Sequence, residues 1–136
     1  MRSVFMRYPG AKPKALTFSY DDGNPQDKKL AAIFDKYGMK GTFNFCGKCM
    51  GERYTADEMN EYFLSKGHEI AVHGENHRAN GNMRPIEGIR DVLNCRLELE
   101  EKCGRIIRGM AYPDTGITLM GNAGGFSRMD AFGSPQ

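Results

Sequence analysis

The sequence predicts an α/β fold built from repeated strand–helix units. Segments rich in β-branched and aromatic residues alternate along the chain with segments in which apolar residues recur at helical spacing. Such alternation is typical of a parallel sheet or barrel. At 136 residues the chain has the length of one domain. We expect a domain over residues 1–113 and an irregular tail over residues 114–136, where no clear period is present.

The first half of the chain predicts two strands with a helix between them. Residues 14–20 (KALTFSY) and 40–45 (KGTFNF) have the composition of strands. Asn24 and Pro25 favour the start of the helix, with Asn24 as N-cap and Pro25 at the first helical position. Gly38 is expected to end it. The predicted apolar face comprises Leu30, Ile33, Phe34 and Tyr37.

The next unit contains a second helix and a short third strand. Thr55 and Glu58 have the spacing of a capping box, which predicts a helix that begins there and runs to Gly67. Residues 68–73 (HEIAVH) have an apolar centre and predict the strand.

A third helix is expected to begin near Pro85 and to end at Gly104, with a fourth strand over residues 105–112 (RIIRGMAY). The helix residues expected to face the core are Ile86, Ile89, Val92, Leu93 and Leu97.

Charge and hydropathy exclude several classes of partner. The 19 basic and 17 acidic residues are spread along the chain, so we expect no nucleic-acid partner. No run of 18 apolar residues is present, which predicts no membrane span. No secretory signal is visible, so the sequence as written predicts a cytoplasmic protein. An extracellular location would require a missing upstream segment.

Residues able to do chemistry gather at the carboxyl ends of the predicted strands, where parallel α/β folds collect their ligands. They are Asp21, Asp22, Cys46, His73, His77 and the pair Tyr112–Pro113.

The acidic pair and the two histidines predict a metal site. Gly23 lets the chain turn, so that both carboxylates can be presented near one site. A bound cation favours the ionised form of both. Two imidazoles and one carboxylate form the ligand set of a catalytic zinc site with an open position, and the second carboxylate could take a proton from water there. Taken alone, DDG is more often a turn and H-x-x-x-H is more often a pair of surface histidines. Because both lie at the ends of predicted strands, together they favour the metal site.

Four segments, LTFSYDDG, GMKGTFNF, GHEIAVHGENH and RGMAYP, resemble in order and spacing the polysaccharide deacetylases of carbohydrate esterase family 4 (NodB-type). The resemblance implies a partial distorted (β/α) barrel and metal-dependent hydrolysis of N-acetyl groups on the amino sugars of a polysaccharide, with zinc as the expected ion. It implies Asp21 as catalytic base and Asp22, His73 and His77 as metal ligands.

The resemblance also gives roles to the end of the fourth strand. We expect substrate contacts from Tyr112, Pro113 and Asp114, with the backbone N–H of Asp114 as a donor to the oxyanion.

The chain departs from the family pattern at three places. Gly74 stands where the family usually has Ser or Thr, so Asn76 or the backbone would have to brace that loop. Ala111 takes the place of the arginine that tethers the base. No histidine follows His77 to act as the family's general acid. We therefore expect a truncated or frame-shifted deacetylase, and an inactive or binding-only fragment is the alternative.

Cys46 and Cys49 have the C-x-x-C spacing of a redox pair. A dithiol redox protein is a further, less favoured interpretation, since no second C-x-x-C is present.

Overall fold

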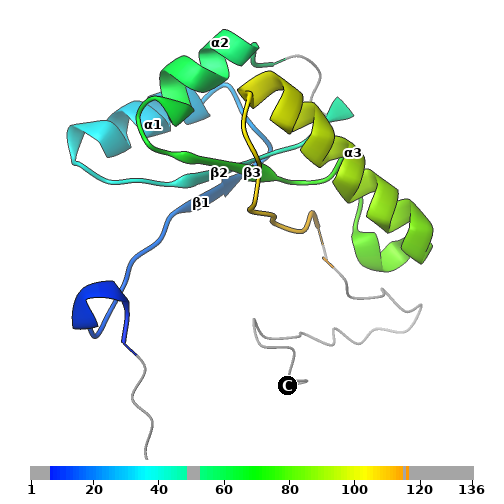
Figure 1. The fold of residues 1–136 in the computed structure, drawn as a ribbon, viewed down its shortest axis with the longest axis horizontal. Helices are drawn as coiled ribbons and strands as arrows, with labels where there is room; N and C mark the ends of the chain where they lie inside the picture. The colour runs from blue at the N-terminus through cyan, green and yellow to red at the C-terminus, as the bar shows by residue number, and fades with distance from the viewer. Residues whose placement is uncertain (1–6, 49–52, 115, 117–136) are drawn as a thin grey trace, which may run out of the picture.

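Three parallel strands form the sheet in the part of the chain that the structure describes. The computed structural model describes residues 7–48, 53–114 and 116. The strands are β1 (Ser19–Asp21), β2 (Thr42–Phe45) and β3 (Glu69–Val72), in the order β1-β2-β3. Both pairings are parallel, as the alternation of strand and helix predicted. The carboxyl ends of all three strands therefore lie at one edge of the sheet (Figure 1).

Helices connect β1 to β2 and β2 to β3, and a further helix follows β3. They are α1 (Asp27–Lys36), α2 (Ala56–Met59), its π-helical continuation η3 (Asn60–Leu64) and α3 (Pro85–Cys103), with 3-10 turns η1 (Pro9–Ala11) and η4 (Asn80–Asn82). In Figure 1, α1 and α2 lie together above the sheet, while α3 lies to the right of it, beside β3. Within the described residues, no helix is both long and apolar enough to cross a membrane.

The core is an aromatic cluster between β2 and the helices. Phe43 and Phe45, alternate residues of β2, share one face of the strand. Their ring centroids lie 4.7 and 5.5 Å from that of Phe63 on η3. Tyr54 adds a fourth ring, 5.3 Å from Phe45. This packing leaves the alternate residue Asn44 on the opposite face of the sheet.

The predicted capping box is confirmed. The Thr55 hydroxyl accepts a hydrogen bond from the Glu58 backbone N–H at 3.2 Å, and the Glu58 carboxylate accepts one from the Thr55 N–H at 2.9 Å. Gly67, with a φ of +80°, lies at the predicted end of this helical segment.

The predicted start of α1 is wrong. The N-cap is Gln26, and its side chain makes no capping hydrogen bond. Asn24 instead accepts a hydrogen bond from Arg53 through its side chain and one from the Tyr54 hydroxyl through its carbonyl. The side-chain oxygen that was expected to cap the helix thus binds a distant arginine instead.

The predicted apolar face of α1 is only partly correct. Phe34 is buried and Leu30 packs against the core, whereas Ile33 and Tyr37 are exposed. Ala31 fills the buried side together with Phe34.

Helix α3 has the predicted ends but a different buried face. Pro85 is its first residue, and Gly104 closes it in the left-handed conformation with a φ of +62°. Asp91, Cys95 and Leu99 face inward. Val92 packs against the core, but the other four residues of the predicted face are exposed, namely Ile86, Ile89, Leu93 and Leu97. The helix turns a different side to the core than its apolar spacing predicted, because Asp91 accepts hydrogen bonds from the loop after β3.

Two of the predicted strands are shorter than expected. Within residues 14–20, regular strand structure begins only at Ser19. Residues 105–112 form no strand and contribute one isolated bridge, in which Met110 pairs with Val72 in parallel orientation. Most of the predicted tail lies outside the described residues.

Candidate active site

The first residue beyond each strand contributes to one cluster. Asp22 follows β1, Cys46 follows β2 and His73 follows β3, and His77 joins them from the loop after β3. Because the strands are parallel and in register, these positions are neighbours at the sheet edge. One ligand atom from each of the four residues lies within 4.8 Å of all the others.

The carboxylate of Asp22 faces both imidazoles. Its Oδ1 lies 3.0 Å from His77 Nε2 and 3.5 Å from His73 Nε2. This oxygen is shielded from solvent and accepts no hydrogen bond from the described residues. A buried oxygen without a hydrogen bond is costly, and a divalent cation would satisfy it together with the two ring nitrogens. Asp22, His73 and His77 therefore fit a transition metal ion.

The orientation of His73 is suited to metal binding. Its Nδ1 lies 3.0 Å from the Ala111 carbonyl oxygen, which can only accept a hydrogen bond. A proton therefore resides on Nδ1, and Nε2, which faces Asp22, is the ring nitrogen that can bind a metal ion. His77 presents Nε2 to the same oxygen, while its Nδ1 lies 3.9 Å from Asp114 Oδ1.

The buried carboxylate of Asp91 holds the loop that carries the histidines. It accepts hydrogen bonds from the backbone N–H of Glu75 at 3.0 Å and of Asn76 at 3.1 Å, and from the Asn76 amide at 2.9 Å. Asn76 and the backbone thus brace the loop, as the sequence suggested for a chain with Gly74 in place of a hydroxyl. Sequence analysis missed Asp91, and no signal for it is visible in the sequence, because this residue lies on the side of α3 opposite the predicted apolar face.

Gly74 is required by the same arrangement. Its φ is +80°, and a Cβ added there would lie 2.7 Å from Asp91 Oδ2. A side chain at this position would therefore push against the carboxylate that braces the loop.

Backbone strain is concentrated at the site. Four non-glycine residues among the described ones have positive φ, and three of them are Asp22 (+78°), His77 (+49°) and Asp114 (+50°). Each costs on the order of 1–3 kcal/mol, and such residues cluster at functional sites. Gly23 turns the chain as predicted, with a φ of +61°, but Asp22 itself also adopts the left-handed conformation.

Asp21 lies outside the four-residue cluster and has a different partner. Its Oδ1 accepts a hydrogen bond of 2.7 Å from Asn44 Nδ2. Asn44 is buried, and its Nδ2 also lies 2.8 Å from Ser19 Oγ and 3.3 Å from the Tyr20 carbonyl. Sequence analysis missed Asn44, which is visible as a polar residue between two phenylalanines of a buried strand.

A third carboxyl group interacts electrostatically with the acidic pair. Asp27 is buried, and its pKa is raised to about 6, chiefly by burial and further by the negative charges of Asp22 and Asp21. The carboxyl groups around the acidic pair therefore disfavour additional negative charge. A bound cation would reduce the repulsion between them.

His68 has a structural role. Its buried Nδ1 accepts a hydrogen bond from the Gly41 N–H at 3.1 Å, and burial lowers the pKa of the imidazole.

The remaining predicted residues lie around the cluster. Tyr112 is half-exposed, whereas Pro113 is buried beside Gly74. Cys46 belongs to the cluster, while its predicted redox partner Cys49 lies outside the described residues.

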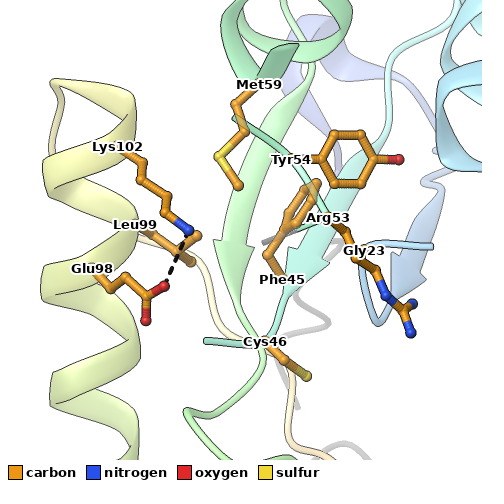
Figure 2. A pocket seen from close by; sticks show the side chains of 9 residues that line it. All are labelled: Gly23, Phe45, Cys46, Arg53, Tyr54, Met59, Glu98, Leu99 and Lys102. Atoms are coloured by element: carbon orange, nitrogen blue, oxygen red, sulfur yellow. Dashed lines mark hydrogen bonds and ion pairs between the residues drawn. The ribbon is translucent and has the colours of Figure 1, made fainter. Parts of the chain in front are cut away.

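A small depression adjoins the cluster on the helix side (Figure 2). Both apolar and charged side chains line it: Gly23, Phe45, Cys46, Arg53, Tyr54, Met59, Glu98, Leu99 and Lys102.

Comparisons with known proteins agree with this geometry. The sequence matches the model of the polysaccharide deacetylase family over residues 8–119. A search among curated protein sequences finds no match. Among solved structures, the Streptococcus pyogenes deacetylase PplD in complex with acetate matches with a TM-score of 0.69 and 20% identity, over 79% of this chain and 50% of that chain.

Two further solved structures have the same fold. The catalytic domain of a peptidoglycan N-acetylglucosamine deacetylase from Eubacterium rectale matches with a TM-score of 0.60 and 21% identity, over 71% of this chain and 43% of that chain. A family 4 acetyl xylan esterase from Clostridium thermocellum, solved in complex with a cobalt ion, matches with a TM-score of 0.57 and 22% identity, over 69% of this chain and 46% of that chain. The predicted partial (β/α) barrel is confirmed, and the chain spans about half the length of these relatives.

Proposed function

The chain belongs to the polysaccharide deacetylase family, and from this we propose that it hydrolyses N-acetyl groups on the amino sugars of a polysaccharide with the help of a divalent transition metal ion, with zinc as the proposed ion. The observation that carries the proposal is the solvent-shielded Asp22 Oδ1, which faces the Nε2 atoms of both His73 and His77 without a hydrogen bond.

The residues of the site divide the work of amide hydrolysis. Asp22, His73 and His77 would hold the ion, which supplies Lewis-acid activation of water and of the acetyl carbonyl when bound. We assign to Asp21 the role of accepting the proton of the attacking water, and the hydrogen bond from Asn44 Nδ2 to its Oδ1, which orients the carboxylate, supports this role. The backbone N–H of Asp114, next to His77, is the proposed donor to the developing oxyanion.

The chemistry of the leaving group determines which class of substrate we expect to be hydrolysed faster. An amine leaves poorly unless it is protonated, and a general acid typically contributes a factor of about a hundred to ten thousand. The described residues contain one histidine besides the two proposed ligands, and this residue, His68, is buried and accepts a hydrogen bond from Gly41, so it is not placed to act as that acid. We therefore expect faster hydrolysis of activated acetate esters than of N-acetyl sugar oligomers.

The test is an assay of both substrate classes with and without chelator, together with elemental analysis. We expect about one transition metal ion per chain and hydrolysis that the chelator abolishes. The double variant His73→Ala/His77→Ala should lose both the metal and the activity. Hydrolysis that persists in this variant would refute the proposed site. Bound metal without any hydrolysis would favour the alternative, a metal-binding fragment that does not turn over.

A further inference from the structure

We infer that Cys46 is a fourth ligand of the proposed metal site and binds the ion through Sγ. The inference rests on the proposed function, because it assumes that Asp22, His73 and His77 bind a metal ion. It changes the donor set from two nitrogens and one oxygen to two nitrogens, one oxygen and one sulfur. This donor set selects a thiophilic ion such as zinc or cobalt over magnesium, calcium or manganese.

The sheet itself places Cys46 between the other ligands. It is the first residue beyond the central strand β2, and the residues that directly follow the two flanking strands are Asp22 and His73. Backbone hydrogen bonds continue on both sides of it, from His73 N–H to the Phe45 carbonyl at 2.9 Å and from Gly47 N–H to the Gly74 carbonyl at 3.0 Å. The backbone of Cys46 is therefore fixed relative to the histidine loop.

The direction of the Cys46 side chain follows from the strand. Side chains alternate across a strand, and Phe45 points to Tyr54 in the aromatic core. Figure 2 shows the Cys46 sulfur leaving the end of β2 away from Tyr54. The sulfur lies 3.5 Å from the carbonyl oxygen of His73, to which the thiol donates. It is thus held beside a residue that supplies a nitrogen ligand.

The four candidate ligand atoms need only a small movement to bind one ion. Two ligands bonded to a tetrahedral zinc ion at about 2.0–2.3 Å lie about 3.3–3.8 Å apart. The separations of Asp22 from His77 and His73, 3.0 and 3.5 Å, are already close to this range. The four ligand atoms lie within 4.8 Å of one another, so a shift of about 1 Å is enough to complete the set.

Charge and solvation favour sulfur ligation. Cys46 is buried, and a thiolate there together with the Asp22 carboxylate would neutralise a divalent cation. The thiol proton is released to solvent as the sulfur–metal bond forms. Four protein ligands fill a tetrahedral site, so water must enter as a fifth ligand or displace the sulfur. Cys46 therefore strengthens metal binding and slows hydrolysis.

Cobalt(II) substitution of the full chain in the presence of a reductant tests the inference. A thiolate ligand produces sulfur-to-cobalt charge-transfer absorption in the near ultraviolet, whereas nitrogen and oxygen ligands alone do not. We expect this band in the wild type and in Cys103→Ser, a control that removes a thiol at the end of α3. Cys46→Ser should bind cobalt without the band.

The affinity of Cys46→Ser for cobalt should fall at least as much as the roughly ten- to hundredfold loss seen when an outer-shell partner is removed. Its hydrolysis per bound metal should rise.

Three results would overturn the inference. Cobalt bound by the wild type without the charge-transfer band would exclude a thiolate ligand and leave the proposed function intact. A band that survives Cys46→Ser but disappears in Cys49→Ser would assign the ligand to Cys49. No cobalt binding by the wild type would refute the metal site, and with it the proposed function.

Discussion

Substitution of Gly74 by alanine should damage the protein far more than the same change at another left-handed glycine. Gly38 is the matched control, because its φ of +66° is similar and a Cβ added there meets nothing within 4 Å. An alanine in this conformation costs about 1–2 kcal/mol, and this cost applies at both positions. At Gly74 the new Cβ would also lie 2.7 Å from Asp91 Oδ2.

The additional cost at Gly74 comes from displacement of Asp91. Its carboxylate accepts three hydrogen bonds from the loop, and a hydrogen bond to a charged group contributes about 1.5–3 kcal/mol. If the displacement breaks one of them, Gly74→Ala loses about 2.5–5 kcal/mol in total, against about 1–2 kcal/mol for Gly38→Ala. Gly74→Ser should behave like Gly74→Ala, although serine is a usual residue of the family at this position.

Urea unfolding of the metal-free variants measures the difference, and Asp91→Ala supplies a second arm. In the Asp91→Ala background the clash is absent, so Gly74→Ala should cost no more than Gly38→Ala does. Equal losses of unfolding free energy for Gly74→Ala and Gly38→Ala in the wild-type background would refute the reasoning.

Three further predictions follow from the site and the helices. Asp22→Ala should lose the metal, whereas Asp21→Asn should keep it and lose hydrolysis by roughly a hundredfold or more; equal metal loss, measured by elemental analysis, would mean that both carboxylates are ligands. The pKa of Asp27 is raised from 3.8 to about 6, so its contribution to stability is present at low pH and is lost as the pH rises through about 6. Asp27→Asn should therefore be more stable than the wild type at pH 7 but not at pH 4, by urea unfolding at both pH values. Thr55→Ala should lower the free energy of unfolding by about 1 kcal/mol through loss of the capping box, and no change in thermal unfolding would argue against it.

Local signals in the sequence predicted the parts of the fold that depend on neighbouring residues. The capping box at Thr55 and the Pro85–Gly104 limits of α3 are set within a few residues of chain, and both are confirmed. The metal-ligand candidates could also be predicted, because they lie at or shortly after the carboxyl ends of predicted strands, and a parallel sheet brings such positions together. The structure places Asp22, His73 and His77 in one cluster with Cys46.

Features that depend on distant contacts could not be predicted. Apolar periodicity placed Ile89 and Leu93 inward, but hydrogen bonds from the histidine loop to Asp91 turn the other side of α3 toward the sheet. Asn24 was expected to cap α1, yet Arg53 and Tyr54 engage it. In both cases a polar group finds a tertiary partner that no local pattern encodes.

The left-handed residues of the site set stability against function. Glycine would relax the backbone at each of Asp22, His77 and Asp114, because it alone adopts positive φ without a steric penalty. At Asp22 and His77 that exchange would delete a proposed metal ligand, so selection for a more stable chain and selection for activity favour different residues there. At Asp114 the backbone N–H is the proposed oxyanion donor, so Asp114→Gly would relax the backbone and keep the ligand set, while it removes the carboxylate beside His77 Nδ1.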